Sequence, residues 1–330
     1  MRAFVTGGSG FVGANLVRLL LKQGYRVRVL VRSTSCLDNL NSLDVEIVKG
    51  NLNDRDLSEK MKGCQVLFHV AAHYSLWQKD KQALYFNNVL GTRNVLAAAA
   101  KIGIERTVYT SSVAAIGVGE NGRAVDESYQ SPVERLIGDY KKSKYWAEQE
   151  ANKAVKLGQD LVIVNPSTPV GAGDLKPTPT GDIILRFLQR RMPFYLNTGL
   201  NLIDVEDVAW GHLLALEKGK TGDRYILGNC NLTLKAILEK LAAITNIPAP
   251  THTIPYPIPY TAAWIDETIL PRFGKKPSVP LDGVRMARQT MYYDATKAKN
   301  ELGLPQSPIE PALKRAIDWF EDKTLDRVEK

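Results

Sequence analysis

The sequence has few of the residues that build disulfide frameworks or metal sites. Its 330 residues include only three cysteines, Cys36, Cys64 and Cys230, and none of them forms a CxxC pair. Of four histidines, His69 and His73 lie close together but lack a further ligand at metal-binding spacing. We therefore expect reduced thiols, no disulfide framework and no metal site.

Long apolar runs are also missing. No stretch approaches the ~20 apolar residues that a membrane-spanning helix needs. The first ten residues, MRAFVTGGSG, pass directly into a strand and a glycine turn, without the basic, apolar and small-residue order of a signal peptide. The sequence thus predicts a cytoplasmic protein without an integral membrane segment.

Basic residues are in excess but are not clustered. The formal net charge is +8, from 43 Lys and Arg against 35 Asp and Glu. These cations are spread along the chain, and no basic block is interleaved with aromatic residues, so nucleic-acid binding is not expected. A solvated surface explains the excess, and a mild attraction for anionic ligands is the alternative.

What the sequence does contain is an alternation of short apolar strands and helices. The alternation predicts an α/β fold with a doubly wound parallel sheet, covered by helices on both faces and joined by right-handed crossovers. The apolar pattern predicts strands at residues 3–6, 27–31, 45–48, 66–70, 107–111 and 161–165, and helices at 14–22, 83–101 and 139–156.

The first strand is followed by GGSGFVG, in which Gly7, Gly10 and Gly13 form a GxxGxxG pattern. A sharp turn, a close approach of the backbone to a pyrophosphate, and tight packing of the next helix are each blocked by a Cβ atom. The helix that follows this loop would offer free N–H groups and a partial positive charge to phosphates. The loop therefore predicts a Rossmann-type dinucleotide-binding domain.

The second predicted strand, in RVRVLVRS, ends on a cation instead of an acid. An acidic side chain at this position would bind the ribose hydroxyls of NAD and repel a 2′-phosphate. Here Arg32 and Ser33 follow the strand, and a guanidinium with a hydroxyl suits a phosphate. The pattern favours NADP(H), with NAD(H) as the alternative if Arg32 is an ordinary surface residue.

Tyr140 and Lys144, in DYKKSKYWAE, lie one helical turn apart and share a face of the predicted helix. A tyrosine has an ordinary pKa near ~10. We expect the Lys144 ammonium to lower that pKa by stabilising the phenolate, and to reach the nicotinamide ribose. Ser112, just beyond the fifth strand, would hydrogen-bond the substrate oxygen, with Ser111 as the alternative.

These motifs, together with NNVLGTRNV and VNPSTPVGAGDLKPTPTG, resemble the extended short-chain dehydrogenase/reductases, which include the NAD-dependent epimerases and dehydratases, over nearly the whole chain. The resemblance implies a structural role for Asn88, and it implies that Ser112, Tyr140 and Lys144 are catalytic. It further implies that the cofactor contacts Gly7, Gly10, Phe11, Val12, Gly13, Arg32, Asn51, Leu52, Ala71, Tyr140, Lys144 and Pro166, and the substrate contacts Ser112, Tyr140 and Asn165. Asn51 stands where the family often has Asp.

Two subfamilies compete. The LVRS and TSS segments are similar to those of dihydroflavonol 4-reductase-like enzymes, and LNTGLNLIDVEDVAWGHLLALEKG is similar to the hopanoid-associated sugar epimerases. Either resemblance implies NAD(P)-dependent hydride transfer to or from a carbonyl or carbinol carbon, with Tyr140 moving the proton. The alternatives are a nucleotide-sugar epimerase or dehydratase that retains NAD, and a catalytically silent NADPH-binding sensor. Intact Ser112, Tyr140 and Lys144 count against the sensor.

The second half of the chain changes character. Residues 165–181 are rich in Pro and Gly, residues 201–208 and 224–227 are expected to be short strands separated by a helix, and residues 247–280 hold 8 of the 17 prolines. So many prolines exclude a regular central element, and this stretch would cap a pocket or lie against a membrane. We expect a dinucleotide-binding domain at 1–165 with returning segments at about 200–230, and a smaller α/β substrate-binding domain at 166–199 and 231–330.

The expected partner is a small-molecule substrate whose identity, with the reaction direction, stays open. Family analogy suggests a homodimer packed through the two long helices at 83–101 and 139–156. Peripheral membrane contact through residues 256–273 is the alternative to a pocket lid there.

Overall fold

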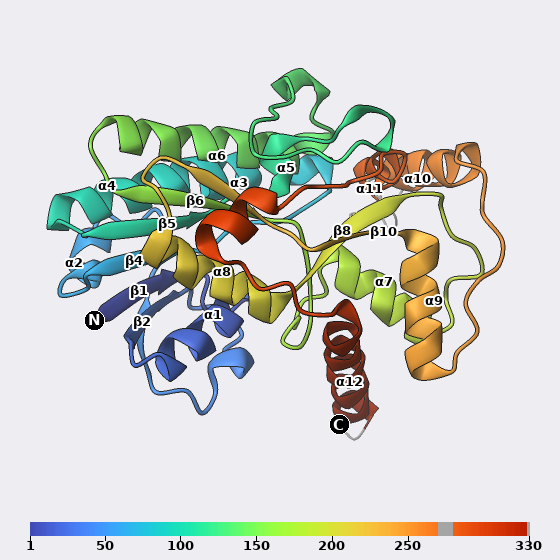
Figure 1. Cartoon of the computed structure of the whole chain (residues 1–330), viewed down its shortest axis with the longest axis horizontal. Helices are drawn as coiled ribbons and strands as arrows, with labels where there is room; N and C mark the ends of the chain where they lie inside the picture. The colour runs from blue at the N-terminus through green and yellow to red at the C-terminus, as the bar shows by residue number, and fades with distance from the viewer. Residues whose placement is uncertain (270–279, 329–330) are drawn as a thin grey trace.

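A seven-stranded parallel sheet forms the larger part of the protein, for which a computed structural model describes residues 1–269 and 280–328 (Figure 1). The strand order is β3-β2-β1-β4-β5-β6-β9. Successive strands are added on one side of β1 up to β3 and on its other side from β4 onward, as in a doubly wound sheet. This confirms the predicted fold class. The strands are β1 (Arg2–Thr6), β2 (Arg26–Val31), β3 (Val45–Lys49), β4 (Val66–His69), β5 (Arg106–Thr110), β6 (Leu161–Pro166) and β9 (Arg224–Leu227).

Helices cover both faces of this sheet because successive strand residues point to opposite sides. Val5 of β1 packs with α1 and α8, whereas Phe4 packs with α2 and α4. The helix α6 completes the second face beside α4 (Figure 1). The bounds are α1 (Phe11–Lys22), α8 (Val205–Lys218), α2 (Leu57–Met61), α4 (Gly91–Ile102) and α6 (Gly138–Lys156).

The helix expected at residues 83–101 consists of three joined parts. It begins with α3 (Lys81–Leu84), continues through the π-helical turn η3 (Tyr85–Leu90) and ends with α4. Gly103 terminates it in the left-handed region, with φ of 71°. Shorter elements are the 3₁₀ turns η1 (Asp38–Leu40), η2 (Gln78–Asp80), η4 (Glu120–Gly122) and η5 (Val133–Arg135), the short helix α5 (Val113–Ile116) and the π-turn η7 (Ala298–Leu302).

A second, three-stranded sheet lies beside the first. Its strands are β7 (Thr168–Val170), β8 (Gly199–Asp204) and β10 (Cys230–Thr233), in the order β10-β8-β7. Their buried side chains pack against three helices, α7 (Pro179–Leu188), α9 (Leu234–Thr245) and α12 (Ile309–Val328) (Figure 1).

The prediction of a strand at residues 201–208 is wrong for the second half of this segment. The chain leaves β8 at Asp204 and enters α8 at Val205, because the Asp204 carboxylate accepts a hydrogen bond from the Glu206 amide and caps the helix. The strand β8 also pairs within the small sheet, so only β9 of the segment 200–230 returns to the large one. The division into two domains stays a prediction.

The proline-rich stretch contains a helix, α10 (Pro257–Ile269), which the sequence pattern did not predict. Proline is tolerated in the first helical turn because the N–H that it lacks has no partner there. The helix α10 packs on α11 (Leu281–Met286) at the edge of the molecule, in keeping with the exclusion of a central element (Figure 1). Residues 270–279, with Phe273, lie outside the described residues.

The three cysteines are free thiols, exposed at Cys36, buried at Cys64 and half-buried at Cys230. Within residues 1–269 and 280–328, no group of His, Cys, Asp and Glu side chains is arranged to hold a metal ion. Over the same part of the chain, each helix is too short or too polar to cross a membrane.

Candidate active site

The predicted site residues gather at one edge of the large sheet. All seven strands are parallel, so their carboxyl ends share this edge, where α/β proteins bind ligands. Each of six strands is followed there by predicted residues: Gly7–Gly13 after β1, Arg32 after β2, Asn51 and Leu52 after β3, Ala71 after β4, Ser112 after β5, and Asn165 with Pro166 at the end of β6.

The glycine loop has the geometry that its sequence predicts. Gly7 has φ of 73°, and a Cβ there would lie 2.6 Å from the backbone nitrogen of Ala71. A Cβ on Gly13 would collide with the Gly7 carbonyl. Gly10 donates its N–H to the Gly7 oxygen at 3.0 Å, and within 4 Å a Cβ on Gly10 would meet that oxygen alone. The loop is therefore closed toward the protein and open beside Gly10.

The open side of this loop fits the pyrophosphate of a dinucleotide. The helix α1 starts at Phe11, so the N–H groups of Phe11, Val12 and Gly13 have no partner within the helix. Its first turn contains no acidic residue that would repel an anion. Together with the space beside Gly10, these N–H groups form a cradle for phosphate.

The segment after β2 forms a compact turn with Arg32 at its start. The Arg32 amide donates to the Ser35 hydroxyl at 3.1 Å, and the Ser35 amide donates to the Arg32 carbonyl at 3.0 Å. The Arg32 side chain is exposed and forms no ion pair in the described part of the chain. Its guanidinium is thus available at the edge where β2 ends.

The segment after β3 lies at the same edge. The Leu52 amide donates to the Asn51 side-chain oxygen at 2.8 Å. Leu52 itself packs against Gly91 at the start of α4, so its side chain supports the helix. Asn51 remains exposed, in the position expected of an adenine contact.

Ser112 is the serine that the fold brings to Tyr140. It caps α5 by accepting the Ala114 N–H at 3.1 Å, and its hydroxyl lies close enough to the Tyr140 phenol to lower the pKa of that phenol. Ser111 is buried and donates to the Glu148 carboxylate at 2.5 Å. The geometry therefore agrees with the preference for Ser112 over Ser111, although the catalytic roles stay a prediction.

The expected lowering of the Tyr140 pKa by Lys144 is wrong for the chain itself. Burial raises the pKa of Tyr140 to about 12, and the nearby Ser112 hydroxyl offsets only part of that shift. The Lys144 ammonium instead donates to the Thr110 carbonyl at 2.9 Å and lies 5.3 Å from the centre of the Tyr109 ring. The phenol is therefore protonated at neutral pH.

Lys144 and His69 form a buried layer behind Tyr140. Burial lowers the pKa of Lys144 to about 8, against the opposing effect of the Glu148 charge. Burial, followed by the Lys144 charge, lowers the pKa of His69 to about 3. The neutral imidazole bridges the Thr6 hydroxyl at 2.7 Å and the Thr92 hydroxyl at 3.0 Å, so it ties β1 to α4.

Asn165, expected to bind substrate, is fully buried. Its amide donates to the Ser112 carbonyl at 3.0 Å and to Glu148 at 2.9 Å. Glu148 also pairs with Arg224 at 3.0 Å. Because both amide protons are used, we propose that Asn165 positions Ser112 from behind and does not touch substrate. Pro166, buried at the end of β6, borders this group.

Two residues of the site were missed by sequence reasoning. Glu148 could have been found, since it follows Lys144 by four residues on the same helix face. Tyr74 has no such signal. Its ring, 42% exposed, meets the Tyr140 ring edge to face at 4.6 Å. We propose that it lines the substrate side of the site.

Asn88 fixes the segment that carries Tyr74. Its side chain accepts from the His73 amide at 2.7 Å and donates to the His73 carbonyl at 2.9 Å and to the Ser143 hydroxyl at 2.9 Å. Asn88 lies in the π-turn η3, which interrupts the long helix next to the site. These bonds agree with the structural role expected of Asn88.

Lys141, next to Tyr140, is 5% exposed and has no ion pair within the described residues. Burial lowers its pKa from 10.5 to about 8. The unfolded chain therefore binds more protons between these two values, and the free energy of unfolding rises with pH across this range. We expect Lys141→Met to raise the free energy of unfolding at pH 7 by about 2 kcal/mol, and by less at pH 10.

Urea denaturation at the two pH values checks this prediction, with Lys142→Met as the matched control. Lys142 is the next residue on α6 and is only half-buried. Lys144 contributes the same pH dependence to both variants, so the difference between them isolates Lys141. A Lys141→Met protein no more stable than Lys142→Met at pH 7 would contradict the expected burial cost.

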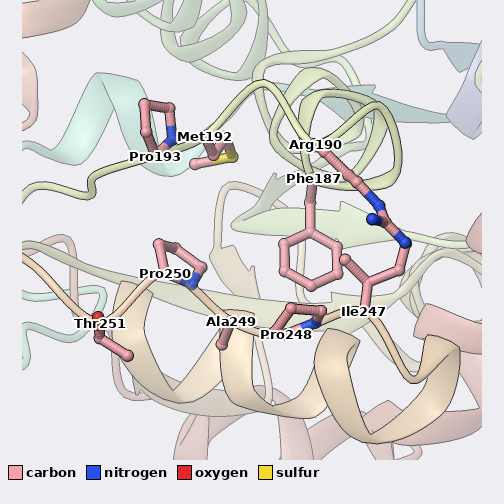
Figure 2. Close-up of a pocket in the computed structure, with 9 residues that line it drawn as sticks. All are labelled: Phe187, Arg190, Met192, Pro193, Ile247, Pro248, Ala249, Pro250 and Thr251. Atoms are coloured by element: carbon pink, nitrogen blue, oxygen red, sulfur yellow. The ribbon is translucent and has the colours of Figure 1, made fainter.

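The proline-rich segment lines a pocket, but this pocket is separate from the candidate active site. Residues Ile247–Thr251 face the end of α7 across a cavity of about 260 Å³, and the Phe187 ring points from α7 toward Pro248 (Figure 2). None of the predicted site residues lines it. The other lining residues are Arg190, Met192 and Pro193.

The doubly wound sheet and the glycine loop define a Rossmann-type dinucleotide-binding protein. The chain belongs to the NAD dependent epimerase/dehydratase family, whose model matches residues 3–228. It is thus an NAD(P)-dependent enzyme of the reductase or epimerase kind, as the sequence predicted.

Relatives of known name extend the match over nearly the whole chain. A Synechocystis protein provisionally named dihydroflavonol 4-reductase is 66% identical over 97% of this chain and 94% of its own length. Sterol demethylase protein B of Methylococcus capsulatus is 32% identical over 98% of this chain and all of its own. The crystal structure of gox2253 superposes with a TM-score of 0.86 at 42% identity, covering 97% of this chain and 98% of that one.

Proposed function

We propose that this protein is an NADPH-dependent carbonyl reductase acting on lipophilic small molecules. The observation that carries the proposal is the proximity of the Ser112 hydroxyl to the Tyr140 phenol at the edge that holds the glycine loop. The names of the two relatives point to polycyclic, largely apolar compounds, a dihydroflavonol and a sterol. This supports a ketone of similar character as the substrate class.

A dinucleotide bound against the glycine loop would supply a hydride to the carbonyl carbon of the substrate. Ser112 and Tyr140 would hold the carbonyl oxygen, and Tyr140 would donate its phenolic proton to that oxygen as negative charge develops there. The Lys144 ammonium, behind the phenol, would stabilise the resulting charge. A pKa of about 12 keeps Tyr140 protonated at neutral pH, which favours reduction over the reverse reaction, where a phenolate base is needed.

The side chain of Arg32 supports NADP(H) as the preferred cofactor. It stands exposed at the end of β2, next to Ser33, without a carboxylate partner in residues 1–269 and 280–328. A guanidinium there can form charge-assisted hydrogen bonds with a 2′-phosphate. NAD(H) remains the alternative that the family description includes.

Release of bound dinucleotide from denatured protein tests the proposal, together with a turnover assay. We expect little retained cofactor, and oxidation of added NADPH that depends on a dihydroflavonol or a steroid ketone. NAD retained in equal amount to protein, with turnover of a nucleotide sugar, would establish the epimerase instead. Tight NADPH binding without hydride transfer to any compound of this panel would favour the silent sensor.

Exposed apolar residues on the helices α6 and η3 support a homodimer. Phe86 and Leu90, four residues apart on η3, are 50% and 36% exposed, and Trp146 of α6 is 42% exposed. We propose that these helices pair with those of a second copy. A cytoplasmic location, which the free thiol of the exposed Cys36 supports, also stays a proposal.

Trp146→Asp is expected to weaken this dimer at least ~100-fold, because a charge would be buried at its centre. Light scattering after size-exclusion chromatography measures the mass. Trp210→Asp is the matched control, since Trp210 is 36% exposed on α8, at the other face of the sheet. Equal masses for the two variants, whether monomer or dimer, would contradict a dimer through α6.

A further inference from the structure

The outer face of α10 is apolar, although it faces solvent. Ile258, Trp264, Ile265 and Ile269 are 55%, 54%, 46% and 45% exposed. Ile258, Ile265 and Ile269 are spaced by seven and four residues, so they share one helix face. The helix has two charged residues, and one of them, Glu267, accepts the Leu281 amide on the inner side. An ordinary surface helix has a polar exposed face, whereas the exposed face of α10 carries large apolar side chains.

The inner face of α10 is already packed, so the outer residues are not an incomplete core. Ala263 is fully buried with Leu281 and Val284 of α11, and Tyr256 and Tyr260 pack around them. The Arg288 guanidinium lies 5.5 Å from the centre of the Tyr256 ring. These contacts hold α10 at the edge of the molecule (Figure 1). Its isoleucines remain exposed to solvent.

The helices α10 and α11 border the candidate active site. A Cβ at Gly138 would lie 2.8 Å from the Asp282 carboxylate, and Gly138 precedes Tyr140 by two residues. Leu76, two residues after Tyr74, lies 3.4 Å from a Cβ position at Gly283. The helix α11 therefore touches both segments that carry the facing tyrosines, and α10 forms the next layer outward.

We propose that the outer face of α10 docks on a lipid bilayer and brings the active site to substrates dissolved there. The choice of substrate source rests on the proposed function, whereas the docking itself does not. An amphipathic helix binds a bilayer by inserting its apolar side chains at the headgroup boundary, where tryptophan is favoured. The two charged residues of α10, Asp266 and Glu267, are acidic, so the binding rests on the apolar side chains.

The size of the face argues for a bilayer over a second protein. A helix of 13 residues is ~20 Å long and ~10 Å wide, which gives a footprint of ~200 Å². A stable protein interface buries ~800 Å² on each partner. Insertion into lipid has no such threshold, because each apolar side chain adds its own transfer free energy.

Flotation of the whole protein with vesicles tests the proposal. The vesicles are phosphatidylcholine alone and phosphatidylcholine with phosphatidylglycerol at a ratio of about 7:3. We expect wild type to float with both, because the apolar side chains carry the binding. Ile265→Ser with Ile269→Ser should lower the partition coefficient at least ~10-fold. Leu157→Ser is the control, since Leu157 is 84% exposed outside this face and its loss should change nothing.

A second measurement does not depend on the folding of the double variant. Brominated lipid should quench wild-type tryptophan fluorescence, and Trp264→Phe should remove most of that quenching. Wild type that stays in the supernatant with both vesicles, or equal quenching of wild type and Trp264→Phe, would overturn the proposal. So would loss of self-association in the double variant without any flotation of wild type, which would assign the face to a second copy.

The proposed function is tested separately from the membrane docking. NADPH oxidation with a water-soluble ketone should be the same in wild type and in the α10 variants, since none of the substituted residues touches the site. Absence of hydride transfer together with flotation would refute the reductase and leave the docking intact. Hydride transfer without flotation would refute the docking alone.

Discussion

Tyr140→Phe is expected to lower kcat for NADPH-dependent carbonyl reduction about 10³-fold, because it removes the proton that the substrate oxygen receives. The affinity for NADPH should change less than about two-fold, since the phenyl ring keeps its edge-to-face contact with Tyr74 at 4.6 Å. Single-turnover absorbance of NADPH measures the first quantity, and NADPH fluorescence titration measures the second.

Tyr74→Phe is the matched control for this experiment. It removes a hydroxyl from the facing ring and leaves Ser112 and the Tyr140 phenol unchanged, so kcat should stay within about five-fold of wild type. If Tyr140→Phe kept a tenth or more of wild-type kcat, Tyr140 would not be the proton donor and the mechanism would be wrong.

The pH dependence follows from the same two side chains. Tyr140 has a pKa of about 12 and stays protonated up to about pH 10, so its ionisation should not slow reduction below that value. Burial lowers the pKa of Lys144 to about 8, and its ammonium is lost as the pH rises through that value. We therefore expect kcat to decline between pH 7 and 9 as Lys144 loses its proton. The pH–rate profile of Lys141→Met checks the assignment, because Lys141 also has a pKa of about 8 and its removal should leave the decline in place.

Arg32→Asp is expected to reverse the cofactor preference. The substitution removes charge-assisted hydrogen bonds to the 2′-phosphate and places a like charge beside it, so kcat/KM for NADPH should fall about 100-fold. With NADH, the aspartate can accept hydrogen bonds from the ribose hydroxyls, and kcat/KM should be equal to wild type or higher. Steady-state kinetics with each cofactor measure both values.

Arg26→Asp is the control for a simple change of surface charge. Arg26 is exposed at the opposite end of the same strand, β2, and so lies at the edge of the sheet away from the cofactor. Its substitution should leave the ratio of the two kcat/KM values unchanged. If Arg32→Asp kept the wild-type ratio of kcat/KM for NADPH to that for NADH, another residue would determine the cofactor preference.

Much of the fold could be predicted from local pattern. The strands of the large sheet are short apolar runs between turns, and buried parallel strands need no other signal. The glycine loop was predictable because Gly7 and Gly13 occupy positions where a Cβ collides with backbone. The spacing of the glycines and the apolar runs is a local pattern, although the collision at Gly7 is with the backbone of Ala71, far along the chain.

The small sheet and its neighbours were harder to predict because local pattern there is ambiguous. The run after Asn201 alternates like a strand, yet the Asp204 side chain caps a helix from the middle of it. The prolines at the start of α10 are typical of a loop. The segment is helical because tertiary packing of Ala263 against α11 stabilises the helix. A local signal was present in both places, but it was compatible with two structures.

The sequence by itself determined the class of this protein: the Rossmann sheet, the dinucleotide loop, and the family to which Ser112, Tyr140 and Lys144 point. Only the tertiary structure decided that Glu148 takes Ser111 and leaves Ser112 for Tyr140, that Asn165 is buried behind them, and that Tyr140 is protonated at neutral pH. The physical reason is that a pKa and a hydrogen-bond partner depend on burial, and burial comes from segments far apart in the chain.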